Sequence, residues 1–451
     1  MRRPSALLGR SAIRPLVLSQ LVSLTGTHVT ALALPTLAVL LLDAGPLAAS
    51  LLFALQYGAR GLTAPLVGVL VDGLRSPRRL LVANDLTHAL VVASVPAMYL
   101  LDVLSLPVLV LVAAASGVLA GVTDISVNAV LPRLVPAAHL VGANASLTGA
   151  RAAGQILGPA LGGLLIQLLG AASAVAVDAV SYLFSAAILG RLRGAERPER
   201  APASAARIRG LRRSVRDFRT SIGEGLATFR EVPLLPRLAL AAAALNVGGA
   251  GLGALYTVYA YRELGLHPVQ VGVLWGVNSA AAMTAVGTAR RVIRRVGLHR
   301  SIGVFAPVAA GSLLLIPAAS LAAPMPLFVV YELLFGYCAT VWTIASASLQ
   351  QRLVPAERMG RVVAFSRTVS VLAVPIGAVV GGVAAGIWPL PLALAGFAVV
   401  ALAGTTVVAV GISRRRDPVP DTGRSAPAAG SGRGGPEPAA AEPAAERVTQ
   451  A

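Results

Sequence analysis

The chain is poor in charge, in aromatic residues and in cysteine, and it contains no lysine. Charged residues make up 13% of its 451 residues, too few to cover a soluble protein of this size. All 38 basic residues are arginine, so no phosphate-binding loop ending in Gly-Lys-Ser/Thr exists and ATP-driven work by this chain is excluded. Aromatic residues make up only 4%, which argues against an aromatic cage around a cation. Cys338 is the single cysteine, so no disulfide can form within one chain.

Long apolar runs are what the chain has instead. Hydrophobic residues make up 56%, the mean hydropathy is +0.76, and runs of about 20 apolar residues recur, the length that crosses a bilayer. We predict an all-α polytopic membrane protein. Its twelve transmembrane helices fall at about 14–42, 47–71, 79–101, 106–131, 140–169, 171–190, 235–261, 268–289, 301–322, 325–350, 362–387 and 389–412.

The arginines predict how these spans are oriented. A net charge of +19 would indicate nucleic-acid binding in a soluble domain, but here the arginines gather in the tails and in the loops of one face. Only Arg262 falls on the other face, while Arg60, Arg151 and Arg367 lie within spans. The bias places both termini in the cytoplasm of a multi-pass protein of the cell membrane. It makes the lipid bilayer, and no nucleic acid, a partner. Arginine without lysine in an Ala- and Gly-rich chain fits a bacterial, GC-rich genome.

Several short stretches occur twice. Gly158, Gly162 and Gly163 return as Gly377, Gly381 and Gly382, Arg133–Pro136 returns as Arg352–Pro355, and Gly68 returns as Gly287. Such a repeat predicts a duplicated chain. We therefore expect a six-helix half at 1–190, a cytoplasmic basic loop at 191–234, a second six-helix half at 235–412 and a tail at 413–451.

The loop and the tail have distinct compositions. Within the loop, the apolar residues of Val215–Arg230 share one helical face, which predicts an amphipathic helix on the inner leaflet or, alternatively, a partner-binding helix. The tail is rich in Ala, Pro, Gly and Ser and lacks the apolar bulk needed to fold, so we expect it to be disordered.

The fifth span carries the most specific motif. Small residues four apart let two helices approach closely, and a proline bends the helix that holds it. Gly154, Gly158, Pro159, Gly162 and Gly163 match the motif associated with antiporters of the major facilitator superfamily, whose two six-helix halves form a parallel repeat. A glycine-rich packing helix of any membrane protein is the alternative.

The chain resembles one branch of that superfamily more closely. The branch contains drug:proton antiporters such as macrolide-efflux and enterobactin exporters, and the resemblance covers about residues 12–412. It is carried by the stretches Ser23–Pro35, Leu131–Pro136, Val177–Tyr182 and Leu349–Pro355. The resemblance implies a major facilitator fold that works by alternating access.

The loop between the second and third spans resembles the superfamily's signature loop. Gly68, Asp72, Arg75, Arg78 and Arg79 follow its spacing, although Gly73 stands where the family has arginine. By resemblance, Asp72 should face the N-terminus of span 11, and one of the three arginines should pair with Asp124. These residues would form a cytoplasmic gate that latches the halves. A solvated basic loop is the alternative reading of the arginines.

Ionisable residues within spans are costly to place in lipid, so each is a candidate site. Glu332, on a span that lines the central cavity in this superfamily, could exchange a proton for cargo, and it is our first candidate for proton coupling. His28 lies mid-span on another cavity helix but could equally be a packing residue. For Asp178, near the outer end of span 6, we expect a structural role ahead of coupling.

Three further polar residues lie within spans. Arg60 and Arg151 should each meet an acid, backbone carbonyls, water or an anionic group of the cargo. Asn246 could bind cargo or join helices.

These observations predict a secondary active transporter and no enzyme. We expect export of a hydrophobic or amphipathic small molecule, such as an antibiotic, drug or secondary metabolite, by proton antiport, with the proton gradient in place of any cofactor or metal. We expect a monomer. A siderophore exporter or an importer of the same fold is one alternative, and a transport-inactive membrane scaffold or sensor is another.

Overall fold

A computed structural model describes residues 5–72, 76–191, 231–321 and 323–413, and within them the chain is helical. The predicted amphipathic helix, the predicted tail and the loop residues Gly73 and Arg75 lie outside this described part, and the side chain of Asp72 is not described either. The first group contains six long helices: α1 (Ser5–Thr36), α2 (Pro46–Asp72), α3 (Pro77–Leu100), α4 (Leu106–Leu134), α5 (Leu140–Leu169) and α6 (Ala171–Gly190). A short helix, η2 (Ala137–His139), precedes α5.

The second group begins after the basic loop. It consists of α8 (Leu234–Val258), α9 (Pro268–Val296), α10 (Leu298–Ser312), the short α11 (Leu315–Ala318), α12 (Pro324–Leu353), α13 (Ala356–Ile387) and α14 (Leu390–Ser413). In the described residues, 11 helical segments are long and apolar enough to cross a membrane. The remaining long helix, α2, has 27 residues and carries Gln56, Tyr57 and Arg60 along its middle. The predicted all-α fold is confirmed, with α2 as its twelfth long helix.

One predicted span is interrupted in the structure. The span predicted at 301–322 is divided into α10 and α11, with the break at Leu313 and Leu314, and its helical part ends at Ala318. Pro317 explains the break, because a proline ring collides with the carbonyl four residues earlier, here that of Leu313.

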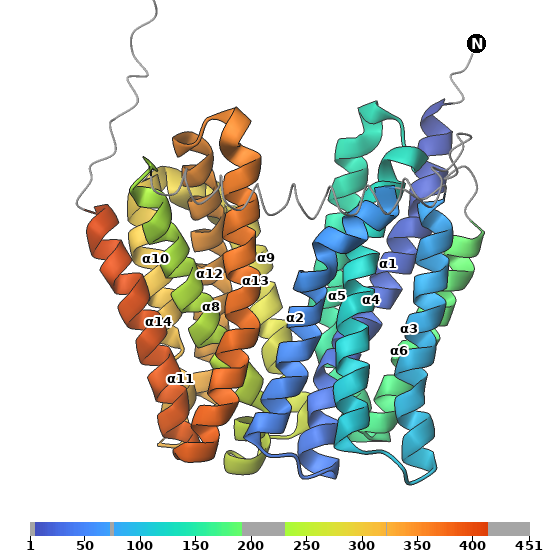
Figure 1. The fold of residues 1–451 in the computed structure, drawn as a ribbon, viewed down its shortest axis with the longest axis horizontal. Helices are drawn as coiled ribbons and strands as arrows, with labels where there is room; N and C mark the ends of the chain where they lie inside the picture. The colour runs from blue at the N-terminus through green and yellow to red at the C-terminus, as the bar shows by residue number, and fades with distance from the viewer. Residues whose placement is uncertain (1–4, 73–75, 192–230, 322, 414–451) are drawn as a thin grey trace, which may run out of the picture. The chain divides into compact units, whose positions relative to one another are not determined.

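The two groups of helices pack in the same way (Figure 1). In the first, α1 contacts α5 and α6, α2 contacts α4, and α3 contacts α4 and α6. In the second, α8 contacts α13 and α14, α9 contacts α12, and α10 contacts α12 and α14. Across the groups, α5 packs on α9 and α13 packs on α2. The pairings therefore repeat, with α1 corresponding to α8 and α5 to α13.

Helices α1 and α8 end in the same local structure, a repeat that the sequence did not reveal. Each ends in a π-helical turn, η1 (Leu37–Leu41) and η3 (Tyr259–Glu263). Each turn is followed by a residue in the left-handed region, Asp43 at φ 48° and Gly265 at φ 62°. π-Helical turns are uncommon and cluster at functional positions, so the ends of α1 and α8 are candidate functional positions.

Candidate transport site

The glycines of the fifth-span motif let α5 lie directly against α1. A Cβ atom built on Gly158 would stand 2.5 Å from Cβ of His28 and 2.8 Å from the carbonyl oxygen of Thr25. Gly154 and Gly162 make looser contacts with the same helix, at 3.2 Å and 3.1 Å. In a bilayer, lipid tails are as apolar as the side chains, so the hydrophobic effect does not drive helices together. Close van der Waals packing of this kind holds them together instead.

The last glycine of the motif faces the other half. A Cβ on Gly163 would lie 2.5 Å from the carbonyl oxygen of Pro268 and 3.2 Å from Cα of Gly272, both on α9. The carbonyl oxygen of Pro159 in turn lies against Gly272. Gly154, Gly158 and Gly162 therefore pack within the first half, whereas Gly163 packs across the interface against α9.

The second copy of the motif repeats this division of labour. Gly377 and Gly381 on α13 lie against α8, and a Cβ on Gly381 would stand 3.0 Å from Cα of Gly251. Gly382 faces α2, where a Cβ would stand 2.9 Å from Cα of Leu47. The sequence repeat is thus a repeat of contacts, and each copy forms one of the contacts between the halves.

A cavity of about 320 Å³ lies between the halves. His28, Phe53, Tyr57, Gln155 and Pro159 line it from the first half. From the second half it is lined by Gly249, Gly253, Tyr256, Trp275, Asn278, Ser279, Tyr331, Glu332 and Phe335. Pockets of about 300–1,000 Å³ are typical of small-molecule sites. The cavity brings together three residues that the sequence singled out, His28, Pro159 and Glu332.

Glu332 is the acid of this cavity. Its side chain is buried, with 3% of the residue exposed, and its Oε1 accepts a hydrogen bond of 2.8 Å from the hydroxyl of Tyr256 on α8. The side-chain amide of Asn278 on α9 donates to the backbone oxygen of Glu332 at 3.3 Å. Three helices of the second half therefore fix the position of this carboxylate.

The few aromatic residues of the chain are unevenly distributed in the structure. The low overall content argued against an aromatic cage, yet six aromatic residues line this one cavity: Phe53, Tyr57, Tyr256, Trp275, Tyr331 and Phe335. They come from four helices, and no pattern in the sequence indicates that these helices lie together. A small number of aromatic side chains is enough when helix packing gathers them around one space.

Asp178 lies in a polar cluster inside the first half. Its carboxylate accepts hydrogen bonds from the hydroxyl of Thr30 on α1 at 2.5 Å and from that of Ser181 at 3.0 Å. Gly26 lies opposite, and a side chain there would occupy the space of Asp178 and Ser181. The acid thus ties α6 to α1, as a structural role requires.

This cluster adjoins the central cavity through a smaller space. A cavity of about 60 Å³ is lined by Asp178, His88 and Arg60, and it shares His28 and Tyr57 with the central cavity. His88 stacks on Tyr182 with 4.0 Å between the ring centroids. His28 accordingly stands between the two spaces, with its Cβ against Gly158.

Among the described residues, Asp124 pairs with an arginine that was not predicted, while Arg75, one of the three predicted, lies outside them. We expected an arginine of the loop between the second and third spans, but Arg60 from α2 donates to Oδ2 of Asp124 through Nε at 2.8 Å and Nη2 at 2.6 Å. Arg78 donates instead to the carbonyl of Gly190 at 2.8 Å, at the end of α6. Gly117 and Gly121 bring α4 against the backbone of α2 and so set this ion pair within reach. The pairing supplies an acid for Arg60 within the membrane.

The other candidate residues lie away from the cavity. Arg79 lies in the first turn of α3, where its backbone N–H donates to the hydroxyl of the N-cap residue Ser76. Arg151 is half-buried on α5 and Asn246 is half-buried on α8, and neither belongs to the described lining of the central cavity. A Cβ on Gly68 would meet no atom of the described part of the chain within 4 Å.

The two π-helical turns meet across the halves at the end predicted to face outside. The hydroxyls of Thr36 and Tyr261 are 2.9 Å apart, and both residues are buried. Arg262 donates to the carboxylate of Asp43 at 2.5 Å and to the backbone oxygen of Val39 at 3.3 Å. We call these four side chains the outer contact: Thr36, Asp43, Tyr261 and Arg262.

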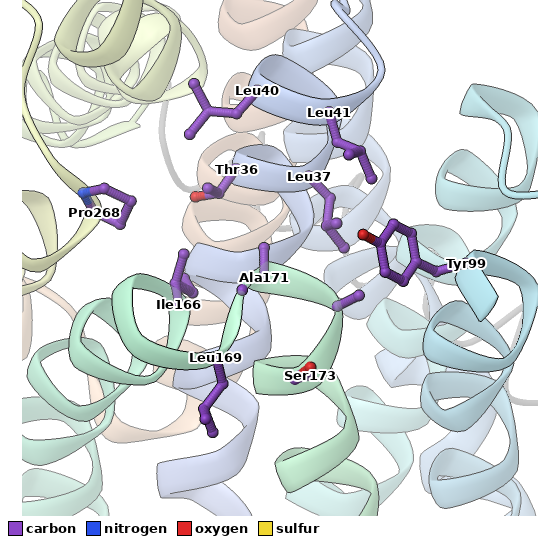
Figure 2. Close-up of a pocket in the computed structure, with 12 residues that line it drawn as sticks. Thr36, Leu37, Leu40, Leu41, Tyr99, Ile166, Leu169, Ala171, Ser173 and Pro268 are labelled. Carbon is purple, nitrogen blue, oxygen red and sulfur yellow. The ribbon is translucent and has the colours of Figure 1, made fainter. Parts of the chain in front are cut away.

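A mostly apolar pocket of about 270 Å³ lies beside the outer contact. Figure 2 shows Leu40, Ile166 and Leu169 around it, with Pro268 contributed by α9 and Tyr99 by α3. Thr36 lines this pocket as well as joining Tyr261. Separation of the outer contact would therefore reshape the pocket.

We predict that the hydroxyl pair matters more to the outer contact than the ion pair does. Tyr261→Phe removes a buried hydrogen bond worth about 0.5–1.5 kcal/mol, and should raise the population with separated outer ends by roughly twofold to tenfold. Asp43→Asn should have less effect, because the side chain of Asp43 is 95% exposed and exposed ion pairs contribute about 0–1 kcal/mol. Distances between spin labels at Asp102 and Glu263, in a Cys338→Ala background, measure both. A larger shift for Asp43→Asn would contradict this ranking.

The sequence comparisons agree with this geometry. The sequence profile described as Major Facilitator Superfamily matches residues 16–377. The chain belongs to the Major Facilitator Superfamily, and it is a multi-pass membrane transporter. An uncharacterized MFS-type transporter of Bacillus subtilis (strain 168), YfiS, is 28% identical over 382 residues, which cover 83% of this chain and 87% of that relative.

Solved structures of the same fold are more distant in sequence. A bacterial homologue of the iron transporter ferroportin in an inward-facing state is 20% identical, with a TM-score of 0.67 over 90% of this chain and 99% of that one. A bacterial homologue of the human lysosomal transporter Spinster, inward-facing and occupied, is 13% identical with a TM-score of 0.67, over 93% and 100% of the two chains. The nucleoside transporter NupG is 12% identical with a TM-score of 0.62, over 89% and 98%. At these identities the likeness concerns the fold.

Proposed function

We propose that the protein exports a hydrophobic or amphipathic small molecule from the cell in exchange for protons, without a cofactor. The observation that carries this proposal is the central cavity, which both halves line and which holds one buried carboxylate, Glu332, among aromatic side chains. A buried carboxylate is stable in lipid surroundings when it is protonated or paired. Proton binding and cargo binding at one such group exclude each other, which is the requirement for exchange.

The contacts between the halves supply the moving part. The outer contact and the glycine contacts of α5 with α9 join the halves toward the predicted outer face, whereas a Cβ built on Gly68 or Gly287, at the predicted inner face, meets no atom of the described residues within 4 Å. This arrangement corresponds to a transporter open toward the cytoplasm. Rocking of the halves about the cavity would separate the outer contact and bring the signature loop, including Asp72, against the second half.

Transport by everted membrane vesicles tests the proposal. Vesicles that contain the protein should accumulate a labelled amphipathic drug when a proton gradient is imposed, and an uncoupler should abolish the accumulation. Glu332→Gln and Pro159→Ala should both reduce it, while Glu263→Gln, at an exposed acid remote from the cavity, should not. Uncoupler-insensitive uptake, or movement in the opposite direction, would favour an importer. Normal growth phenotypes with no transport in any variant would favour a scaffold or sensor.

A further inference from the structure

The central cavity becomes negative when its acid is ionised. Among its described lining residues, Glu332 is the acid, His28 is the one group that could carry a positive charge, and arginine is absent. In the described part of the chain, Glu332 accepts hydrogen bonds from neutral groups: its carboxylate from the hydroxyl of Tyr256 and its backbone oxygen from the amide of Asn278. Neutral donors orient a carboxylate but leave its charge uncompensated, so the site favours a cation or a proton.

The walls around this acid are aromatic ring systems. Tyr256 meets Trp275 edge-on with 6.1 Å between centroids, and Tyr331 lies 5.6 Å from Phe335. On the other half, Phe53 and Tyr57 are 4.5 Å apart. The faces of such rings carry negative electrostatic potential and attract cations, most strongly for Trp and Tyr. Both halves therefore contribute surfaces that suit a cation with apolar groups.

The size and flanks of the cavity limit what this cation can be. A volume of about 320 Å³ exceeds that of a hydrated metal ion and fits a compact organic molecule. Hard metal cations also favour several charged oxygen ligands, whereas the described lining offers one carboxylate, and its other side-chain oxygens belong to neutral amides and hydroxyls.

We propose that the cargo is an organic cation that carries aromatic or other bulky apolar groups, held with its charge at Glu332 and its apolar groups against Trp275, Tyr256, Tyr331 and Phe335. This inference rests on the proposed role of the cavity as the transport site. It adds the sign of the cargo's charge to the proposed function. An anionic or uncharged cargo of the same size would leave the carboxylate uncompensated.

Two probes of equal shape and opposite charge test the inference. Tetraphenylphosphonium and tetraphenylborate differ in charge but scarcely in size, and equilibrium dialysis of each against the purified protein in detergent, with empty micelles as the blank, measures binding. We expect saturable binding of the cation and none of the anion. Glu332→Gln should weaken cation binding at least about tenfold, whereas Glu263→Gln should leave it unchanged. Trp275→Leu should weaken it about threefold to thirtyfold, and Trp275→Phe should restore most of the affinity.

The dependence on pH gives a readout that a merely structural role would not move. Acidification should weaken cation binding in the wild type, because a proton competes for Glu332, and should have a smaller effect in Glu332→Gln. The other titratable groups facing the cavity are His28, Tyr57, Tyr256 and Tyr331, so His28→Gln serves as the matched control and should retain the dependence. Equal binding of both ions, or binding unaffected by Glu332→Gln in a monodisperse sample, overturns the inference.

The binding result and the transport result fail separately. Proton-driven export of neutral drugs without tetraphenylphosphonium binding would leave the proposed function standing and reject a cationic cargo. Charge-selective binding in a protein that transports nothing would retain the site and reject the exporter.

Discussion

Gly158→Leu should destabilise the first half and remove most transport activity. The new side chain would collide with Cβ of His28 and with the carbonyl oxygen of Thr25, at 2.5 Å and 2.8 Å from the position of its own Cβ. Neither atom can rotate away, because one belongs to the backbone and the other is bonded to it. Helix α1 must therefore move away from α5. Overpacking costs about 1–3 kcal/mol even where side chains can adjust, and a cost of about 2 kcal/mol changes an equilibrium roughly thirtyfold.

Heating followed by size-exclusion chromatography in detergent measures this loss, and vesicle transport measures its consequence. Gly149→Leu is the matched control, since Gly149 lies on the same helix with no atom within 4 Å of a built Cβ. Gly154→Leu should fall between the two, because its contacts begin at 3.2 Å. Equal thermal stability of the Gly158 and Gly149 variants would show that α1 and α5 are not held by this contact.

The fold could be predicted well from the sequence because a membrane span needs a long run of apolar residues, which is visible in the composition of the segment. About 20 consecutive apolar residues suffice to predict a span. The break between α10 and α11 shows the limit of that reasoning. An apolar run through Pro317 reads as continuous, whereas the backbone geometry of proline interrupts the helix.

The sequence also found the glycine motif, yet it could not say which helix each glycine contacts. Spacing by four residues predicts a close approach, but only the structure assigns Gly158 to α1 and Gly163 to α9. The aromatic wall was missed for a similar reason. Phe53, Tyr256 and Trp275 lie on three helices that are far apart in the sequence, and no periodicity links them.

The pairing of Asp124 with Arg60 was missed because the prediction relied on a resemblance in the signature loop. Arg60 had been noted as a charge needing a partner, and Asp124 as an acid near the inner end of α4, but nothing in the sequence measured their separation. Gly117 and Gly121 supply the missing link, since they allow α2 and α4 to approach until the two side chains meet.

Exchanging the charges of Arg60 and Asp124 should rescue what each single change removes. Arg60→Gln or Asp124→Asn leaves the opposite charge without its partner, which costs about 3–5 kcal/mol for a fully buried pair. The side chains are 41% and 37% exposed, so we discount this to about 1–3 kcal/mol. Each single variant should lose about tenfold in proton-driven transport. The double variant Arg60→Asp with Asp124→Arg should recover to within about threefold of the wild type.

A second double variant separates stability from mechanism. Arg60→Met with Asp124→Leu replaces the pair by apolar side chains of similar length, a change that is often neutral or stabilising for buried ion pairs. We expect this protein to be as heat-resistant as the wild type but inactive in transport, because Arg60 lines the small cavity that adjoins His28 and Asp178. Full activity in the apolar variant would reduce the pair to a packing element of α2 and α4. Failure of the charge exchange alongside a stable apolar variant would instead show that the position of the positive charge, and not only its pairing, is required.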